Sequence, residues 1–138
     1  MFLTFLNKHK DLGLLVVRIG LGLAFLLIHG LPKLQGGPER WQALGASMST
    51  LGITFAPQFW GFLSAFVETA AGVVLIFGLF YRPFLPLLII NMIVAVASNI
   101  GGQWLKVAYP LEMLIFGFLL FMLGPGKYSL DNLFFKKA

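Results

Sequence analysis

The chain has 138 residues with a mean hydropathy of +0.90, and only 11% of them are charged, against about a quarter in soluble domains; this predicts an integral membrane protein in a lipid bilayer. The net charge of +5 does not indicate a nucleic-acid partner, because the basic residues flank apolar runs, where they orient spans and meet anionic lipid. Cysteine is absent, which excludes disulfides, thiolate-held iron–sulfur clusters and cysteine zinc sites, and no metal site is expected.

The chain begins with a short stretch, residues 1–10, that suits an interfacial foot. The start superficially resembles a signal peptide, but its apolar run is too long and no A-x-A-like site closes it, so a retained first span is predicted at residues 12–34. Residues 38–52 predict a short amphipathic helix that lies on the membrane surface or caps the bundle, because Trp41, Leu44 and Met48 recur at helical spacing.

Three further apolar runs predict spans. They cover residues 59–80, 83–100 and 106–123. The short connection around Arg82 makes the second and third spans an antiparallel hairpin, and Gly124 begins a stop signal after which Ser129 caps a last helical turn. The predicted fold is all-α: one domain over residues 1–138, a four-helix transmembrane bundle with a short amphipathic surface helix between the first two spans.

The basic residues are distributed unevenly between the two ends of these spans. One end carries Lys8, Lys10, Arg82, Lys127, Lys136 and Lys137, and the other carries Arg40 and Lys106. The positive-inside rule therefore predicts that both termini lie in the cytoplasm, in a multi-pass protein of a bacterial inner membrane.

Two layers of polar residues interrupt the spans. At 1.5 Å per residue, Arg18 lies about 9 Å from the cytoplasmic boundary and Glu68 about 14 Å from the outer one, with Asn91 at a similar height. Because an unpaired charge is costly at that depth, we expect an ion pair between Arg18 and Glu68, bridged by Asn91.

The second layer is expected nearer the outer face. His29, Asn99 and Glu112 fall at similar heights, and Lys33 shares a helical stripe with His29. These four residues predict a ligand or proton site, roofed by Trp41, Trp60 or Trp104. The alternative is that such polar residues only hold the helices together, and that Lys33 extends to the headgroups.

The sequence resembles the DoxX family of small four-helix membrane proteins. The resemblance rests on Arg18 in RIGLGLAFLL, on HGLPK at residues 29–33, on Glu68 in FVETAAGVVLIFGLFYRP, and on GPGKYSLD at residues 124–131. It implies a four-helix bundle. It also suggests a quinone-linked redox role, because the family is named for a membrane subunit of a thiosulfate:quinone oxidoreductase.

Three functions are compatible with these features. The first is a quinone-binding or membrane-anchor subunit of a redox complex, in which His29 and Glu112, with Lys33 or Asn99, contact the quinone. The electron carrier would belong to a membrane or peripheral protein partner, since His9 and His29 lie at opposite ends of one helix and cannot ligate one haem. The second is a scaffold or assembly factor, with a homo-oligomer also open. The third and weakest is a small-solute or lipid transporter, for which four spans leave little room.

Overall fold

The computed structural model describes residues 7–135, and all regular structure in that range is helical. The elements are α2 (Lys10–Leu23), the π-helix η1 (Ala24–Gly30), α3 (Leu31–Leu34), α4 (Gly37–Gly45), the 3₁₀-helix η2 (Ala46–Leu51), α5 (Pro57–Phe77), α6 (Tyr81–Asn99), α7 (Trp104–Leu123) and α8 (Leu130–Phe135). Most of the predicted interfacial foot, residues 1–6, lies outside the described residues, as do Lys136 and Lys137.

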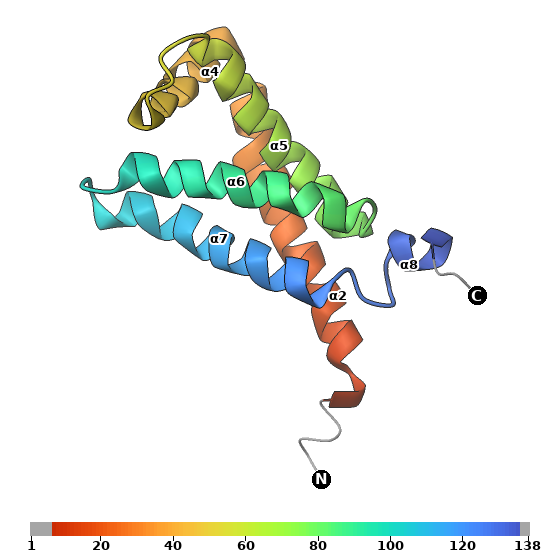
Figure 1. The fold of residues 1–138 in the computed structure, drawn as a ribbon. Coiled ribbons are helices and arrows are strands. Elements are labelled where there is room, and N and C mark those ends of the chain that lie inside the picture. The colour runs from red at the N-terminus through yellow and green to blue at the C-terminus, as the bar shows by residue number, and fades with distance from the viewer. Residues whose placement is uncertain (1–6, 136–138) are drawn as a thin grey trace.

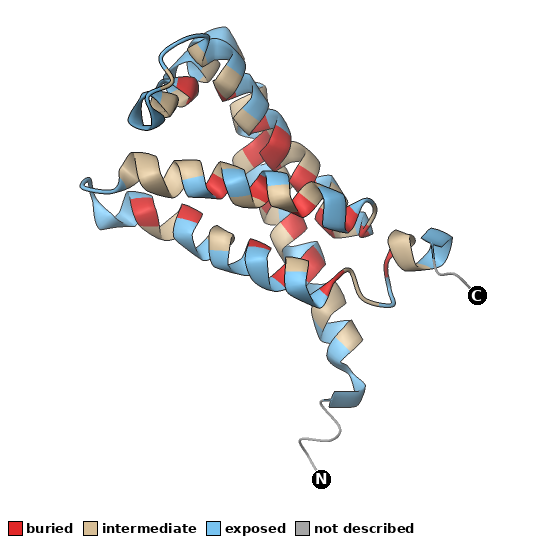
Figure 2. Ribbon diagram, viewed as in Figure 1, coloured by how far each residue is buried: buried red, intermediate tan, exposed pale blue. Residues whose placement is uncertain are grey.

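Four of the helical stretches are long and apolar enough to cross a membrane. They are Lys10–Leu34, Pro57–Phe77, Tyr81–Asn99 and Trp104–Leu123. These agree with the four predicted spans to within one helical turn, so the all-α, four-span class is confirmed. Figure 2 shows wide exposed faces on these helices; such faces are apolar at Ile28, Ile90 and Ile115 and suit lipid contact.

The spans are arranged as two pairs of helices. The continuous rod α2–η1–α3 packs along α5, whereas α6 and α7 run antiparallel beside each other and cross that first pair (Figure 1). Between the pairs lies a core of buried side chains: Phe25, Ala71, Leu75, Tyr81, Leu85, Leu88, Met92 and Leu120.

A pair of glycines sets the register of the first helix pair. A Cβ added at Gly22 would lie 2.8 Å from the carbonyl oxygen of Gly72, and one added at Gly72 would lie 2.7 Å from the carbonyl oxygen of Gly22. The two backbones are therefore in direct contact, which is the close approach that small residues permit between membrane helices.

The π-helix η1 in the middle of the first span was not predicted. Its wider turn ends where the backbone N–H of Leu31 donates to the carbonyl of Leu26, five residues back. The prediction that Lys33 shares one stripe with His29 assumed a regular α-helix throughout, and the π-turn changes the direction of every side chain that follows it.

The predicted amphipathic helix is present as α4 followed by η2, and it caps one end of the first helix pair. α4 packs so tightly on α5 that a Cβ on Gly61 would lie 1.8 Å from the carbonyl oxygen of Trp41. The Trp41 ring meets Phe62 edge-on at 5.0 Å, and its indole N–H donates to the carbonyl of Lys33 (3.1 Å). This segment is consequently a roof held by α5.

The opposite end is held together by the segment around α8. The Asp131 carboxylate accepts hydrogen bonds from the backbone N–H groups of Phe80 (2.8 Å) and Tyr81 (2.9 Å), at the start of α6. The Ser129 hydroxyl accepts from the backbone N–H of Asn132 (3.1 Å), which confirms the predicted cap. The start of α2 lies at this end too, because Lys127 and Asp11 form an ion pair at 3.9 Å.

Candidate functional site: a polar cavity among the spans

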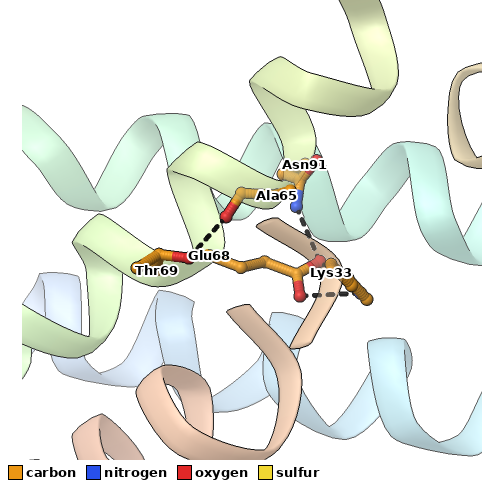
Figure 3. Close-up of polar contacts among 5 residues, drawn as sticks. All are labelled: Lys33, Ala65, Glu68, Thr69 and Asn91. Carbon is orange, nitrogen blue, oxygen red and sulfur yellow. Dashed lines mark hydrogen bonds and ion pairs between the residues drawn. The ribbon is translucent and has the colours of Figure 1, made fainter. Parts of the chain in front are cut away.

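A buried carboxylate on α5 is the centre of the polar cluster inside the spans. Glu68 is 2% exposed, and the Lys33 ammonium lies 2.8 Å from its Oε1 and 2.7 Å from its Oε2. The side-chain amide of Asn91, on α6, donates a third hydrogen bond to Oε1 (3.1 Å) (Figure 3). The negative charge is thus neutralised by one cation and further stabilised by an amide, as a charge at this depth requires.

The predicted ion pair between Arg18 and Glu68 is wrong. Arg18 is 1% exposed and donates hydrogen bonds to backbone carbonyls instead. Its acceptors are the carbonyl oxygens of Leu75 (3.0 Å), Ile76 (3.2 Å), Tyr128 (3.2 Å) and Pro125. The physical reason is helix register: along α5, Leu75 is seven residues from Glu68, or about 10 Å at 1.5 Å per residue.

Arg18 therefore stabilises the end of the bundle near α8 and takes no part in the polar cluster around Glu68. Two of its acceptors are free carbonyls in the last turn of α5, and the other two lie in the loop between α7 and α8. The guanidinium also lies 5.9 Å from the centre of the Tyr81 ring. A single arginine joins the first, second and last segments of the chain, and the rigid fork of N–H groups suits that task.

A cavity of about 620 Å³ adjoins the Lys33–Glu68 pair. It lies among α4, η2, α5, α6 and α7, and its apolar wall includes Leu63, Val67, Leu87, Ile90 and Val94. Its polar lining consists of Lys33, Ser47, Ser64, Glu68, Asn91, Ser98, Asn99, Lys106 and Tyr109. This volume and the mostly apolar lining with a few polar groups are typical of small-molecule sites.

The structure divides the predicted outer layer into two groups. Lys33 and Asn99 line the cavity, but His29 and Glu112 do not. Glu112 is exposed, on the outer face of α7, because the turn of that helix directs Val107 and Pro110 inward and the glutamate away. The prediction that His29 and Glu112 line one pocket is therefore wrong, and only Lys33 and Asn99 remain as candidates from that set.

His29 instead lies against a residue that the sequence reasoning missed. Its ring stacks on the Tyr109 ring with centroids 3.9 Å apart and planes at 19°. Tyr109 lines the cavity, and its hydroxyl is buried without a hydrogen-bond partner in the part of the chain described. A tyrosine one turn before Glu112 in an otherwise apolar span was the available signal, since a buried phenol normally finds a partner.

Of the three predicted roof tryptophans, only Trp60 lines the cavity. Trp104 is 85% exposed, and Trp41, a residue of α4, is half-buried against Phe62. Much of the roof is made by Leu44, Ser47 and Met48, which come from α4 and η2. The hydroxyl of Ser98 on α6 donates to the carbonyl of Val94 (2.7 Å) and lies 3.4 Å from the carbonyl of Ser47, across the top of the cavity.

These features define a multi-pass membrane protein with a mostly apolar cavity, lined by a few polar groups, among its spans. The DoxX family model matches residues 13–100, well over half of the chain, and the protein belongs to that family. The match includes Arg18, the HGLPK segment and Glu68, whereas GPGKYSLD at residues 124–131 lies beyond it. No curated protein and no solved structure matches the chain.

Proposed function

We propose that the protein binds a lipid-soluble quinone in this cavity, as the quinone-binding or anchor subunit of a membrane redox complex. The observation that carries the proposal is the cavity of about 620 Å³ beside a buried ion pair, among helices apolar enough to span the bilayer. A ligand that partitions into lipid is concentrated around such helices, and a cavity with apolar walls and a few polar groups suits a flat ring with two carbonyl oxygens.

The cavity also has hydrogen-bond donors for the two carbonyl oxygens of a quinone. Its carbonyl oxygens accept hydrogen bonds, and an ammonium has three N–H donors, of which Lys33 uses two on Glu68. Asn91 uses one of its two amide N–H groups in the same way. One donor on each side chain is thus left for a ligand beside the cavity, and the Tyr109 hydroxyl has no partner among the described residues.

In this proposal the protein positions the ring and exchanges protons. Reduction of a quinone to a quinol takes up two electrons and two protons. Lys33 and Glu68 are the ionisable groups that exchange protons with the ring oxygen, while the electrons come from a protein partner that holds the redox centre. His29 acts indirectly, by holding the Tyr109 ring, and Glu112 has no part in the site.

The test is quinone binding to the purified protein with a filled cavity as the comparison. Val94 lines the cavity, and its neighbour Ile93 is 50% exposed on the outer face of α6, so Val94→Phe and Ile93→Phe form a matched pair. We expect a short-chain ubiquinone analogue to bind the wild type and Ile93→Phe alike in titration calorimetry. Val94→Phe should weaken binding at least about tenfold, the effect of about 1.4 kcal/mol.

Two outcomes would contradict the proposal. If the wild-type protein does not bind the quinone, the redox role is wrong and a scaffold role becomes the better account. If Val94→Phe and Ile93→Phe bind equally well, the quinone binds elsewhere on the protein.

A further inference from the structure

A second cleft lies at the opposite end of the spans, where the α5–α6 connection meets α8. Its volume is about 620 Å³, and its walls include Phe80, Arg82, Pro83, Pro125, Asn132 and Phe135. None of these residues belongs to the quinone cavity. The cleft is therefore a separate feature, at the end of the helices where Lys127 and Asp11 also lie.

The cleft presents an unpaired guanidinium. Arg82 is exposed and has no ion pair or side-chain hydrogen bond with any other residue between 7 and 135. Its guanidinium lies along the turn after α7, where a Cβ on Gly124 would be 3.3 Å from one of its nitrogens. The arginine is thus held beside the cleft wall, with its N–H donors unused.

The one acidic residue in the cleft lining already accepts two backbone hydrogen bonds. Asp131 lines the cleft, but its Oδ1 and Oδ2 accept the backbone N–H groups of Phe80 and Tyr81. Its charge thereby faces the positive, N-terminal end of α6. Among the described residues, no carboxylate forms an ion pair with Arg82, which leaves its charge available to an external anion.

The other side of the cleft is apolar and exposed. Phe80 and Phe135 are 59% and 62% exposed, and their ring centroids lie 6.3 Å apart. α8 continues this surface, since Leu133 and Phe134 are also more than half exposed. A short helix with such a face lies in the membrane interface, with its apolar side chains among the acyl chains.

We propose that this cleft binds an acidic phospholipid. The phosphate and the charged headgroup region are held by Arg82, and an acyl chain lies against Phe80 and Phe135. Arginine binds phosphate through paired N–H donors, and the excess of basic groups at this end attracts anionic lipid from the adjoining leaflet. This site does not depend on quinone binding, which takes place at the other end of the helices.

The test is native mass spectrometry of the detergent-solubilised protein, titrated with phosphatidylglycerol or phosphatidylcholine of identical acyl chains. The wild type should bind phosphatidylglycerol more tightly. Arg82→Gln should lower that affinity about tenfold, as expected for a charged hydrogen-bonded contact, and leave phosphatidylcholine binding unchanged. The control is Arg40→Gln, which removes an exposed cation from the opposite end, outside both cavities, and should change neither affinity.

Phe135→Ser provides a second variant that removes the apolar wall and keeps the charge. This variant should weaken the binding of both phosphatidylglycerol and phosphatidylcholine. The proposal is overturned if Arg82→Gln binds phosphatidylglycerol like the wild type, or if Arg40→Gln causes an equal loss, which would show general charge attraction. Displacement of the lipid by millimolar inorganic phosphate would equally overturn it, because the site would then recognise phosphate alone.

Discussion

The Lys33 ammonium and the Glu68 carboxylate, 35 positions apart in the sequence, meet through two contacts of 2.7 and 2.8 Å. The two partners are buried unequally: the Glu68 side chain is 2% exposed and the Lys33 side chain 20%. Because Glu68 is the more deeply buried of the two, losing the partner charge should lower the free energy of unfolding more when Glu68 is left alone than when Lys33 is left alone.

The first prediction is that Lys33→Met destabilises the protein more than Glu68→Gln. Removing the lysine leaves a fully buried carboxylate without a cation, at a cost of about 3 kcal/mol. Removing the carboxylate leaves an ammonium on a long chain that extends toward the roof and the polar boundary, so the cost is about 1 kcal/mol. Reversible unfolding in mixed micelles measures both, and the double variant should recover most of the loss. Equal single effects that simply add would contradict this.

The second prediction concerns Arg18. In Arg18→Lys, one ammonium with three N–H donors replaces a fork that reaches four carbonyls on two segments, so at least one of those acceptors loses its donor. We expect a loss of about 2–3 kcal/mol and release of the segment around Pro125 and Tyr128. Limited trypsin digestion should then cleave after Lys127 faster than in the wild type. Arg82→Lys, at an exposed arginine of the same end, should digest like the wild type; if Arg18→Lys does as well, Arg18 does not hold this segment.

The third prediction separates the ring of Tyr109 from its hydroxyl. Tyr109→Phe keeps the stack on His29 and removes a buried hydroxyl without a partner, so the ligand-free protein should be as stable or up to about 1 kcal/mol more stable. Quinone affinity should nevertheless fall, because the donor is lost. Tyr109→Leu removes the stack as well and should lower both stability and affinity. A Tyr109→Phe protein that binds quinone like the wild type would remove the hydroxyl from the site.

The fourth prediction concerns the roof of the cavity. A methyl group at Gly61 meets the backbone of Trp41, which cannot rotate away, so Gly61→Ala must move α4 and should cost about 1–3 kcal/mol. Movement of α4 also disturbs the roof, and quinone affinity should fall. Gly20→Ala is the control, because a Cβ there meets nothing within 4 Å. Thermal unfolding of both variants decides the point: equal midpoints would show that α4 is not held by this contact.

The sequence predicted some local features of the site correctly. Glu68 is buried and bonded to Asn91, and Ser129 and the amphipathic segment after the first span occur where the pattern indicated. These features depend on burial of a charge or on hydrogen bonds within a few residues. The choice of cation for Glu68 depends on how two helices slide and turn relative to each other. Depths estimated from span boundaries place Glu68 between Arg18 and Lys33, and they do not decide which of the two it contacts.

By itself, the sequence determined that four helices cross a membrane and that their buried charges need partners, since lipid tolerates neither open backbone groups nor lone charges. Only the tertiary structure decided which partners those are. The contact of Gly22 with Gly72 and the π-turn before Gly30 set the register that gives Glu68 to Lys33 and leaves Arg18 to the carbonyls at the helix ends. Backbone contact between two helices depends on how their surfaces pack together, and the residue pattern along either helix does not specify it.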